Sequence, residues 1–144
     1  PPAPASLYRR PAWWFHPLGI ETKRARPLTE VARYADHLWH WADSGAEVVS
    51  AKLGLLPGVG PWTIGSTLGP VLGDPDAVPV GDYHHPNTVA WALAGEPRAD
   101  DDRMLALLEP YRGQRGRVLW ALTSAAGPAP KFGPRQRILP MARW

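Results

Sequence analysis

The chain has 144 residues, of which 44% are hydrophobic and 20% charged, and its formal net charge is +3. These values exclude a disordered chain and predict a folded domain with one modest core. The absence of cysteine excludes disulfides, a cysteine nucleophile, cysteine-ligated zinc and an iron–sulfur cluster. No apolar run approaches the length of a membrane span and no export signal opens the chain, so we expect a cytoplasmic protein without a membrane partner.

The first half of the chain predicts two helices after an irregular start. Residues 1–20 are rich in Pro and aromatic residues, and we expect an irregular lead segment there. Apolar residues recur at helical spacing over 27–41, which predicts a helix. Ser44 and Glu47 stand at the spacing of a capping box, in which each side chain satisfies an amide at the helix end. This box predicts a short helix that ends at about Leu53.

The second half predicts four more helices. Pro61 suits the first turn of a helix to about Leu72, and residues 77–80 form an extended approach to the next helix. The later helices are expected over 84–94, 100–108 and 114–125, with Asp100, Asp101 and Asp102 at the start of the middle one. No β alternation or internal repeat is present, so the predicted fold class is all-α. We expect a helical bundle with one domain over 21–126, followed by a basic, Pro-rich tail over 127–144.

Basic residues are concentrated in two regions. From Tyr111 to the end of the chain there is no acidic residue and there are seven basic ones, namely Arg112, Arg115, Arg117, Lys131, Arg135, Arg137 and Arg143. A smaller group consists of Lys23, Arg24 and Arg26. Each group is typical of either a phosphate-facing surface or an ordinary solvated face.

Residues 46–72 are predicted to form two helices joined by a short turn, which is the arrangement of a helix-hairpin-helix. Gly58 and Gly60 carry no side chain, so their amides can approach a phosphate closely, and the helix that follows adds its free amides and positive dipole end. We expect the backbone of Gly58, Val59, Gly60, Trp62 and Thr63 to bind a DNA phosphate. The carbonyls of Gly54, Leu56 and Val59 could face a monovalent cation, Na⁺ or K⁺. The alternative is a plain turn between two helices.

Two motifs together resemble a known family. The first is Leu56-Pro57-Gly58-Val59-Gly60-Pro61-Trp62-Thr63, and the second is Val80-Gly81-Asp82-Tyr83, with Asp82 24 residues after Gly58. Pro110-Tyr111-Arg112, followed ten positions after Pro110 by Trp120, adds a third match. The stretch from about Gly19 to Trp120 resembles the helix-hairpin-helix DNA glycosylases, and within them the alkyladenine (3-methyladenine) branch, glycosylase II.

The resemblance implies a monofunctional enzyme that releases a damaged base in base excision repair and leaves an abasic site. Relatives that also cleave the strand carry a lysine shortly after the hairpin glycines, and Trp62 stands at that place here. Lys52 lies upstream on the first hairpin helix. The implied partner is double-stranded DNA with alkylated bases. The resemblance implies no required cofactor, no obligate protein partner and a location at the nucleoid.

Asp82 is the candidate catalytic residue. Cleavage of an N-glycosidic bond builds positive charge on the deoxyribose, and a fixed carboxylate stabilises that charge and orients or deprotonates the attacking water. A base alkylated at a ring nitrogen is already cationic, so it leaves without a general acid, and one carboxylate suffices where ordinary glycosidases use two. The alternative role for Asp82 is an N-cap for the helix beginning near Tyr83, which is compatible with catalysis because a cap fixes the carboxylate's orientation.

Aromatic side chains are the candidate lesion pocket. A flipped cationic purine is attracted to aromatic faces by stacking and by cation–π interaction. Trp62 follows the hairpin turn and should face the groove near Asp82. Tyr83 and Trp120 are further candidates, although for both a place in the core is the commoner alternative. The pairs His37 and His40, and His84 and His85, lack further ligands at zinc spacing and are better explained as surface or capping residues.

The chain departs from the family pattern at its N-terminal side. The family's helical domain carries several helices before the segment that matches Gly19-Ile20-Glu21-Thr22-Lys23, and these form the other wall of the cleft. We expect this chain to lack them. A non-catalytic helix-hairpin-helix DNA-binding module, or an inactive fragment of such an enzyme, is therefore the main alternative. A helical protein-interaction domain that uses the aromatic surface is a third possibility.

Overall fold

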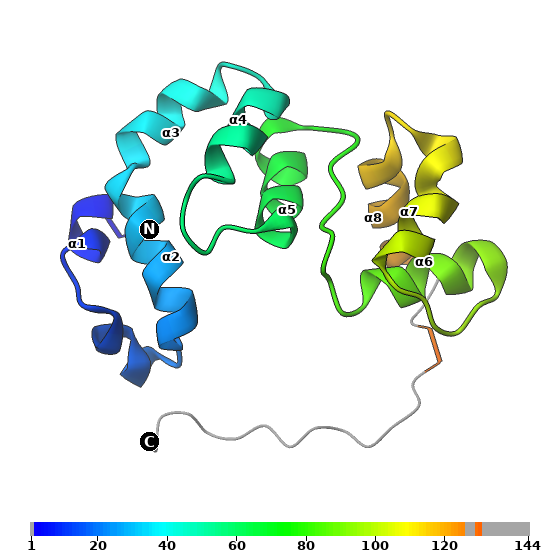
Figure 1. Cartoon of the computed structure of the whole chain (residues 1–144), viewed down its shortest axis with the longest axis horizontal. Coiled ribbons are helices and arrows are strands. Elements are labelled where there is room, and N and C mark those ends of the chain that lie inside the picture. The colour runs from blue at the N-terminus through cyan, green and yellow to red at the C-terminus, as the bar shows by residue number, and fades with distance from the viewer. Residues whose placement is uncertain (1, 126–128, 131–144) are drawn as a thin grey trace. The chain divides into compact units, whose positions relative to one another are not determined.

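The computed structural model describes residues 2–125 and 129–130, and it is all-α, with no strand in that part of the chain (Figure 1). The described residues divide into two compact units, one that ends at Gly60 and one that begins at Pro61. The expected domain over 21–126 therefore extends across both units. Within the described ranges, no helix is long and apolar enough to cross a membrane. The predicted basic tail lies outside the described residues except for 129–130.

The unit that ends at Gly60 contains four α-helices and a 3₁₀ helix. They are α1 (Pro4–Tyr8), η1 (Ala12–Leu18), α2 (Thr22–Arg33), α3 (Ala35–Ala42) and α4 (Ala46–Leu53). Both α1 and η1 contact α2, and Phe15 of η1 is buried, as are Ala25 and Ala32 of α2. The expectation of an irregular lead segment over 1–20 is therefore wrong. The two helices have five and seven residues and both contain proline, so no helical periodicity marks them in the sequence.

Two further expectations for this unit need correction. The helix predicted over 27–41 is in fact two helices, since α2 begins at Thr22, contains Pro27 and ends at Arg33, and α3 begins at Ala35. The capping box is absent, since α4 begins after Gly45, whose φ is +86°, and no side chain caps it. The left-handed Gly45 separates Ser44 from the helix, so Ser44 is one residue too early to cap.

The unit that begins at Pro61 follows the predicted helix bounds closely. Its elements are α5 (Pro61–Leu72), α6 (His85–Ala94), α7 (Asp101–Leu108), η2 (Glu109–Tyr111) and α8 (Arg115–Ala125). Asp100 caps α7 by accepting a hydrogen bond from the Arg103 amide at 2.9 Å, as the acidic run predicts. Helices α6, α7 and α8 enclose a core of fully buried side chains, Val89, Met104, Leu108 and Leu119 (Figure 1).

A connecting segment with turns at 75–76 and 80–81, residues 74–82, runs between α5 and α8 and leads to the candidate catalytic residue. A Cβ on Gly65 of α5 would lie 2.3 Å from the Val78 carbonyl oxygen, and one on Gly116 of α8 would lie 2.5 Å from the carbonyl oxygen of Ala77. Both helices therefore approach the segment's backbone at distances that only glycine permits. The segment is held in place from both sides.

The start of the same segment is fixed by an ion pair. The Asp76 carboxylate accepts hydrogen bonds from the Gly113 amide at 2.8 Å, the Arg115 amide at 2.9 Å and the Arg115 guanidinium. These donors lower the pKa of Asp76 to about 2, with the Arg115 side chain the main cause and partial burial opposing it. The loop before Asp82 is thereby tied to the first turn of α8.

Candidate functional site

Both carboxylate oxygens of Asp82 accept hydrogen bonds. Oδ1 accepts from the amides of His84 at 2.7 Å and His85 at 2.9 Å, and Oδ2 accepts from the indole Nε1 of Trp62 at 2.8 Å. Asp82 therefore satisfies two amides at the start of α6, but α6 begins at His85 and its N-cap is His84, so Asp82 is not itself the N-cap that the capping alternative predicts. The bond to Trp62 is not part of a helix cap, because Trp62 is the second residue of α5.

The environment of Asp82 favours its ionised form. Partial burial raises the pKa of the carboxyl, but the Trp62 indole and the amides of His85 and His84 outweigh it, so the pKa lies below its ordinary value. At neutral pH the group is an anion. A carboxylate has about four acceptor positions. The described donors use two on Oδ1 and one on Oδ2, which leaves one position on Oδ2 for an external group.

The side chain of His85 lies next to the Asp82 carboxylate. It is 12% exposed, and its Nδ1 lies 3.6 Å from Oδ1 of Asp82 and makes no described hydrogen bond. Burial lowers the pKa of His85 against the opposing charge of Asp82, with His84 lowering it further, so the ring is neutral at pH 7. The sequence identifies His85 only as half of an adjacent histidine pair. Its burial depends on packing that no local pattern reveals.

The three candidate aromatic residues differ in their relation to Asp82. Trp62, 48% exposed, contacts it directly, as its position after the turn predicts. Tyr83 is 76% exposed and Trp120 is 40% exposed, so neither lies in the core. The Trp120 ring meets the His85 ring edge to face at a centroid distance of 5.4 Å, so it reaches Asp82 only through His85.

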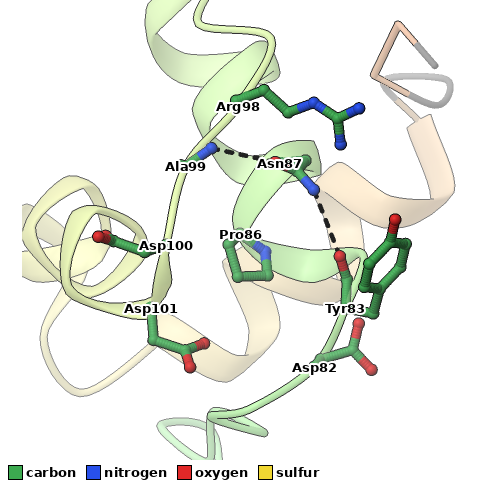
Figure 2. Close-up of a pocket in the computed structure, with 8 residues that line it drawn as sticks. All are labelled: Asp82, Tyr83, Pro86, Asn87, Arg98, Ala99, Asp100 and Asp101. Carbon is green, nitrogen blue, oxygen red and sulfur yellow. Dashed lines mark hydrogen bonds between the residues drawn. The ribbon is translucent and has the colours of Figure 1, made fainter. Parts of the chain in front are cut away.

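Asp82 and Tyr83 line a surface pocket of about 470 Å³, shown in Figure 2. The other lining residues are Pro86, Asn87, Arg98, Ala99, Asp100 and Asp101. Asn87 holds two sides of the pocket together, since its Oδ1 accepts from the Ala99 amide at 3.0 Å and its Nδ2 donates to the Tyr83 carbonyl at 3.3 Å. The exposed Tyr83 ring thus stands at a pocket that Asp82 makes anionic.

The two hairpin glycines have different structural requirements. Gly58 has a φ of +84°, and a Cβ there would lie 2.4 Å from Cγ of Pro27, so the fold itself needs glycine at this position. Gly60 has no such φ, and an added Cβ would meet no described atom within 4 Å. Internal packing therefore does not explain Gly60.

The remaining candidates lie along the same turn. The Val59 amide donates to the Leu56 carbonyl at 3.0 Å within the turn. The Leu56 carbonyl, one of the three expected to face a monovalent cation together with those of Gly54 and Val59, therefore already accepts one hydrogen bond. Trp62 and Thr63 lie in the first turn of α5, where backbone amides are free.

Two further candidates from the sequence are Lys52 and a metal site. The Lys52 ammonium lies 5.1 Å over the Trp41 ring, within the unit that ends at Gly60. In the part of the chain that the structure describes, no three His, Cys, Asp or Glu side chains are grouped to hold a metal ion. Comparison with known proteins adds no relative: no family model, curated protein or solved structure matches this chain.

Proposed function

We propose that this protein is a monofunctional DNA glycosylase that removes alkylated purines of the 3-methyladenine type from duplex DNA and leaves an abasic site. The hydrogen bond between Trp62 and Asp82 is the observation that carries the proposal. It joins the first turn of α5, where a phosphate would bind, to an ionised carboxylate. Anchor and acid are thereby held at a fixed separation, which chemistry on a nucleotide requires and simple DNA binding does not.

The reaction uses Asp82 as an anion. The bond between C1′ and the base nitrogen breaks, and its electron pair neutralises the alkylated base as it leaves. Positive charge grows on the deoxyribose, and the carboxylate stabilises it through the open position on Oδ2. Water then adds to C1′ and releases a proton to Asp82 or to solvent. The lowered pKa of Asp82 suits charge stabilisation better than general acid catalysis.

Aromatic side chains beside this anion supply lesion recognition. Trp62, which is hydrogen-bonded to the carboxylate, is half-exposed, and Tyr83, the residue after Asp82, is largely exposed, so each offers aromatic surface to a base. A cationic purine gains from both the aromatic faces and the negative charge. A neutral, paired base lacks that attraction and is harder to flip out of the duplex.

The phosphate anchor consists of the turn 58–60 and the first residues of α5, which would act together as a helix-hairpin-helix. Free amides at the helix start, together with its dipole, favour an anion. The open backbone at Gly60 supports this role, because no atom of the described residues would lie within 4 Å of a Cβ there. A Na⁺ or K⁺ held by the carbonyls of Gly54, Leu56 and Val59 would offset part of the phosphate charge.

A DNA-binding module without catalysis is the second candidate. It is favoured by the hydrogen bonds from His84 and His85, which give Asp82 a structural role at the start of α6. In that case the turn would bind duplex DNA, and the carboxylate would only stabilise the helix.

Product analysis separates the two candidates. Methylated duplex DNA is incubated with the full chain, free bases are identified by chromatography, and strand breaks are scored before and after alkali. A monofunctional glycosylase yields free 3-methyladenine and breaks that appear only after alkali. Salt-sensitive binding without released base would identify the module instead. The Gly60→Ala variant should lose binding and release together.

A further inference from the structure

The amide that directly precedes the candidate catalytic residue is held by a second carboxylate. The Gly81 amide donates to both Oδ1 and Oδ2 of Asp101, at 3.1 Å each, and the two residues are 20 positions apart. Asp101 is the first residue of α7 and lines the pocket that contains Asp82. In Figure 2 its carboxylate extends from α7 toward the chain that leads to Asp82.

Helix capping does not account for Asp101. Asp100 already caps α7 through the Arg103 amide, and Asp102 supplies a second negative charge in the same helical turn. Asp102 is exposed, whereas Asp101 is partly buried. The side chain of Asp101 thus accepts hydrogen bonds from the Gly81 amide, which lies outside its own helix in the segment 74–82.

Gly81 needs such an anchor. Its φ is +93°, a conformation that glycine adopts freely, but glycine also has many alternatives and no side chain to fix it. Asp76 fixes the start of the segment on α8, and Asp101 fixes its end on α7. Without the second anchor, a shift of about 1 Å at Gly81 would carry Asp82 out of hydrogen-bond range of Trp62.

We propose that Asp101 is a positioning residue: by holding the Gly81 turn, it keeps the Asp82 carboxylate against Trp62 and in line with the reacting sugar. This rests on the proposed glycosylase function for its effect on rate. Its effect on geometry is independent of DNA. Misplacement of a reacting group by about 1 Å lowers rates roughly 100-fold.

The test compares Asp101→Ala and Asp101→Asn with the matched control Asp102→Ala, which removes the same charge from the same turn of α7. The first readout is the NMR resonance of the Trp62 indole N–H in the free protein, assigned with Trp62→Phe. The second is the single-turnover rate of base release together with the affinity for methylated duplex DNA.

Asp101→Ala should move the indole resonance upfield, because Trp62 loses its acceptor, and should lower the release rate roughly 100-fold, with affinity nearly unchanged. Asp101→Asn should be intermediate, since its amide oxygen still accepts from Gly81, and it serves if the alanine variant does not fold. Asp102→Ala should leave the resonance in place.

An unchanged indole resonance in Asp101→Ala, or an equal shift in Asp102→Ala, overturns the positioning role. If the unaltered protein releases no base, the glycosylase proposal fails, but the resonance still decides what Asp101 does.

Discussion

Trp62 and Asp82, 20 residues apart, are joined by a hydrogen bond of 2.8 Å from the indole nitrogen to Oδ2. Trp62 belongs to α5, and Asp82 ends the connecting segment, residues 74–82, that runs between α5 and α8. The bond lowers the pKa of the carboxyl against the opposing effect of burial. This contact therefore contributes, with the His84 and His85 amides, both to the place of the acid and to its charge.

Trp62→Phe should shift the acid limb of the activity profile to higher pH. The indole donor stabilises the ionised carboxylate, so its removal raises the pKa of Asp82. Activity requires ionised Asp82 and falls as the pH drops below the pKa of this carboxyl. Because that pKa is higher in the variant, the variant loses activity at a higher pH. Single-turnover rates measured against pH check this, with Trp91→Phe, an exposed residue of α6, as control. Identical acid limbs in the two variants would contradict the role given to Trp62.

Asp76→Asn should lower the free energy of unfolding at pH 7 by about 2 kcal/mol. The pKa of Asp76 is about 2 in the folded protein against an ordinary value of 3.8. A depressed carboxyl pKa contributes stability that is present above about pH 4 and is lost as pH falls toward 2. The free energy of unfolding, measured in urea at several pH values, should therefore change less with pH in the variant between about pH 4 and pH 2. The exposed Asp43→Asn should leave the slope unaltered.

Two glycines of α5 should respond oppositely to alanine. A Cβ on Gly65 would lie 2.3 Å from the Val78 carbonyl oxygen, so Gly65→Ala should destabilise the protein by about 1 to 3 kcal/mol. At Gly69 the nearest atoms would lie at 3.7 Å, an ordinary contact, and Gly69→Ala should stabilise by about 0.5 to 1 kcal/mol. Thermal melting of the two variants measures the difference. Equal melting temperatures would contradict the close packing of α5 on the segment.

Alanine substitution of the two hairpin glycines should affect DNA binding in one case and folding stability in the other. Gly60→Ala should leave stability within about 0.5 kcal/mol, because the added Cβ meets no described atom within 4 Å. Its affinity for duplex DNA should fall roughly tenfold as the methyl group obstructs a phosphate. Gly58→Ala should instead unfold more easily, since its φ of +84° and the nearby Pro27 both oppose a side chain. Melting and salt-dependent binding decide between these outcomes, and unimpaired binding by Gly60→Ala would remove the turn from the interface.

Local signals predict the helices from Pro61 onward well. Pro61 at a helix start and Asp100 as an N-cap act through neighbouring backbone, so sequence alone reveals them. The departures come from distant contacts. Pro27 looks like a helix start, but it lies inside α2 with its ring close against Gly58. Packing there stabilises a helix that continues through a proline.

The residues of the candidate site are likewise predictable only in part from the sequence. The family resemblance singles out Asp82 and the place of Trp62 after the turn predicts that it lies near Asp82, and the hydrogen bond between them confirms that proximity. The sequence does not reveal that Asp101 holds Gly81 or that Arg115 holds Asp76, since each contact joins segments far apart in the chain. The exposure of Tyr83 and Trp120 is likewise a result of tertiary packing.

The rate of base release from methylated duplex DNA, compared between this protein and Asp82→Asn under single-turnover conditions, tests the central claim most directly. Asparagine keeps the size of the side chain and an oxygen for the His84 and His85 amides, but it removes the charge. The account predicts release that falls by about 100-fold or more in the variant while DNA affinity is retained. Equal rates in the two proteins, or no release by the unaltered one, would contradict it.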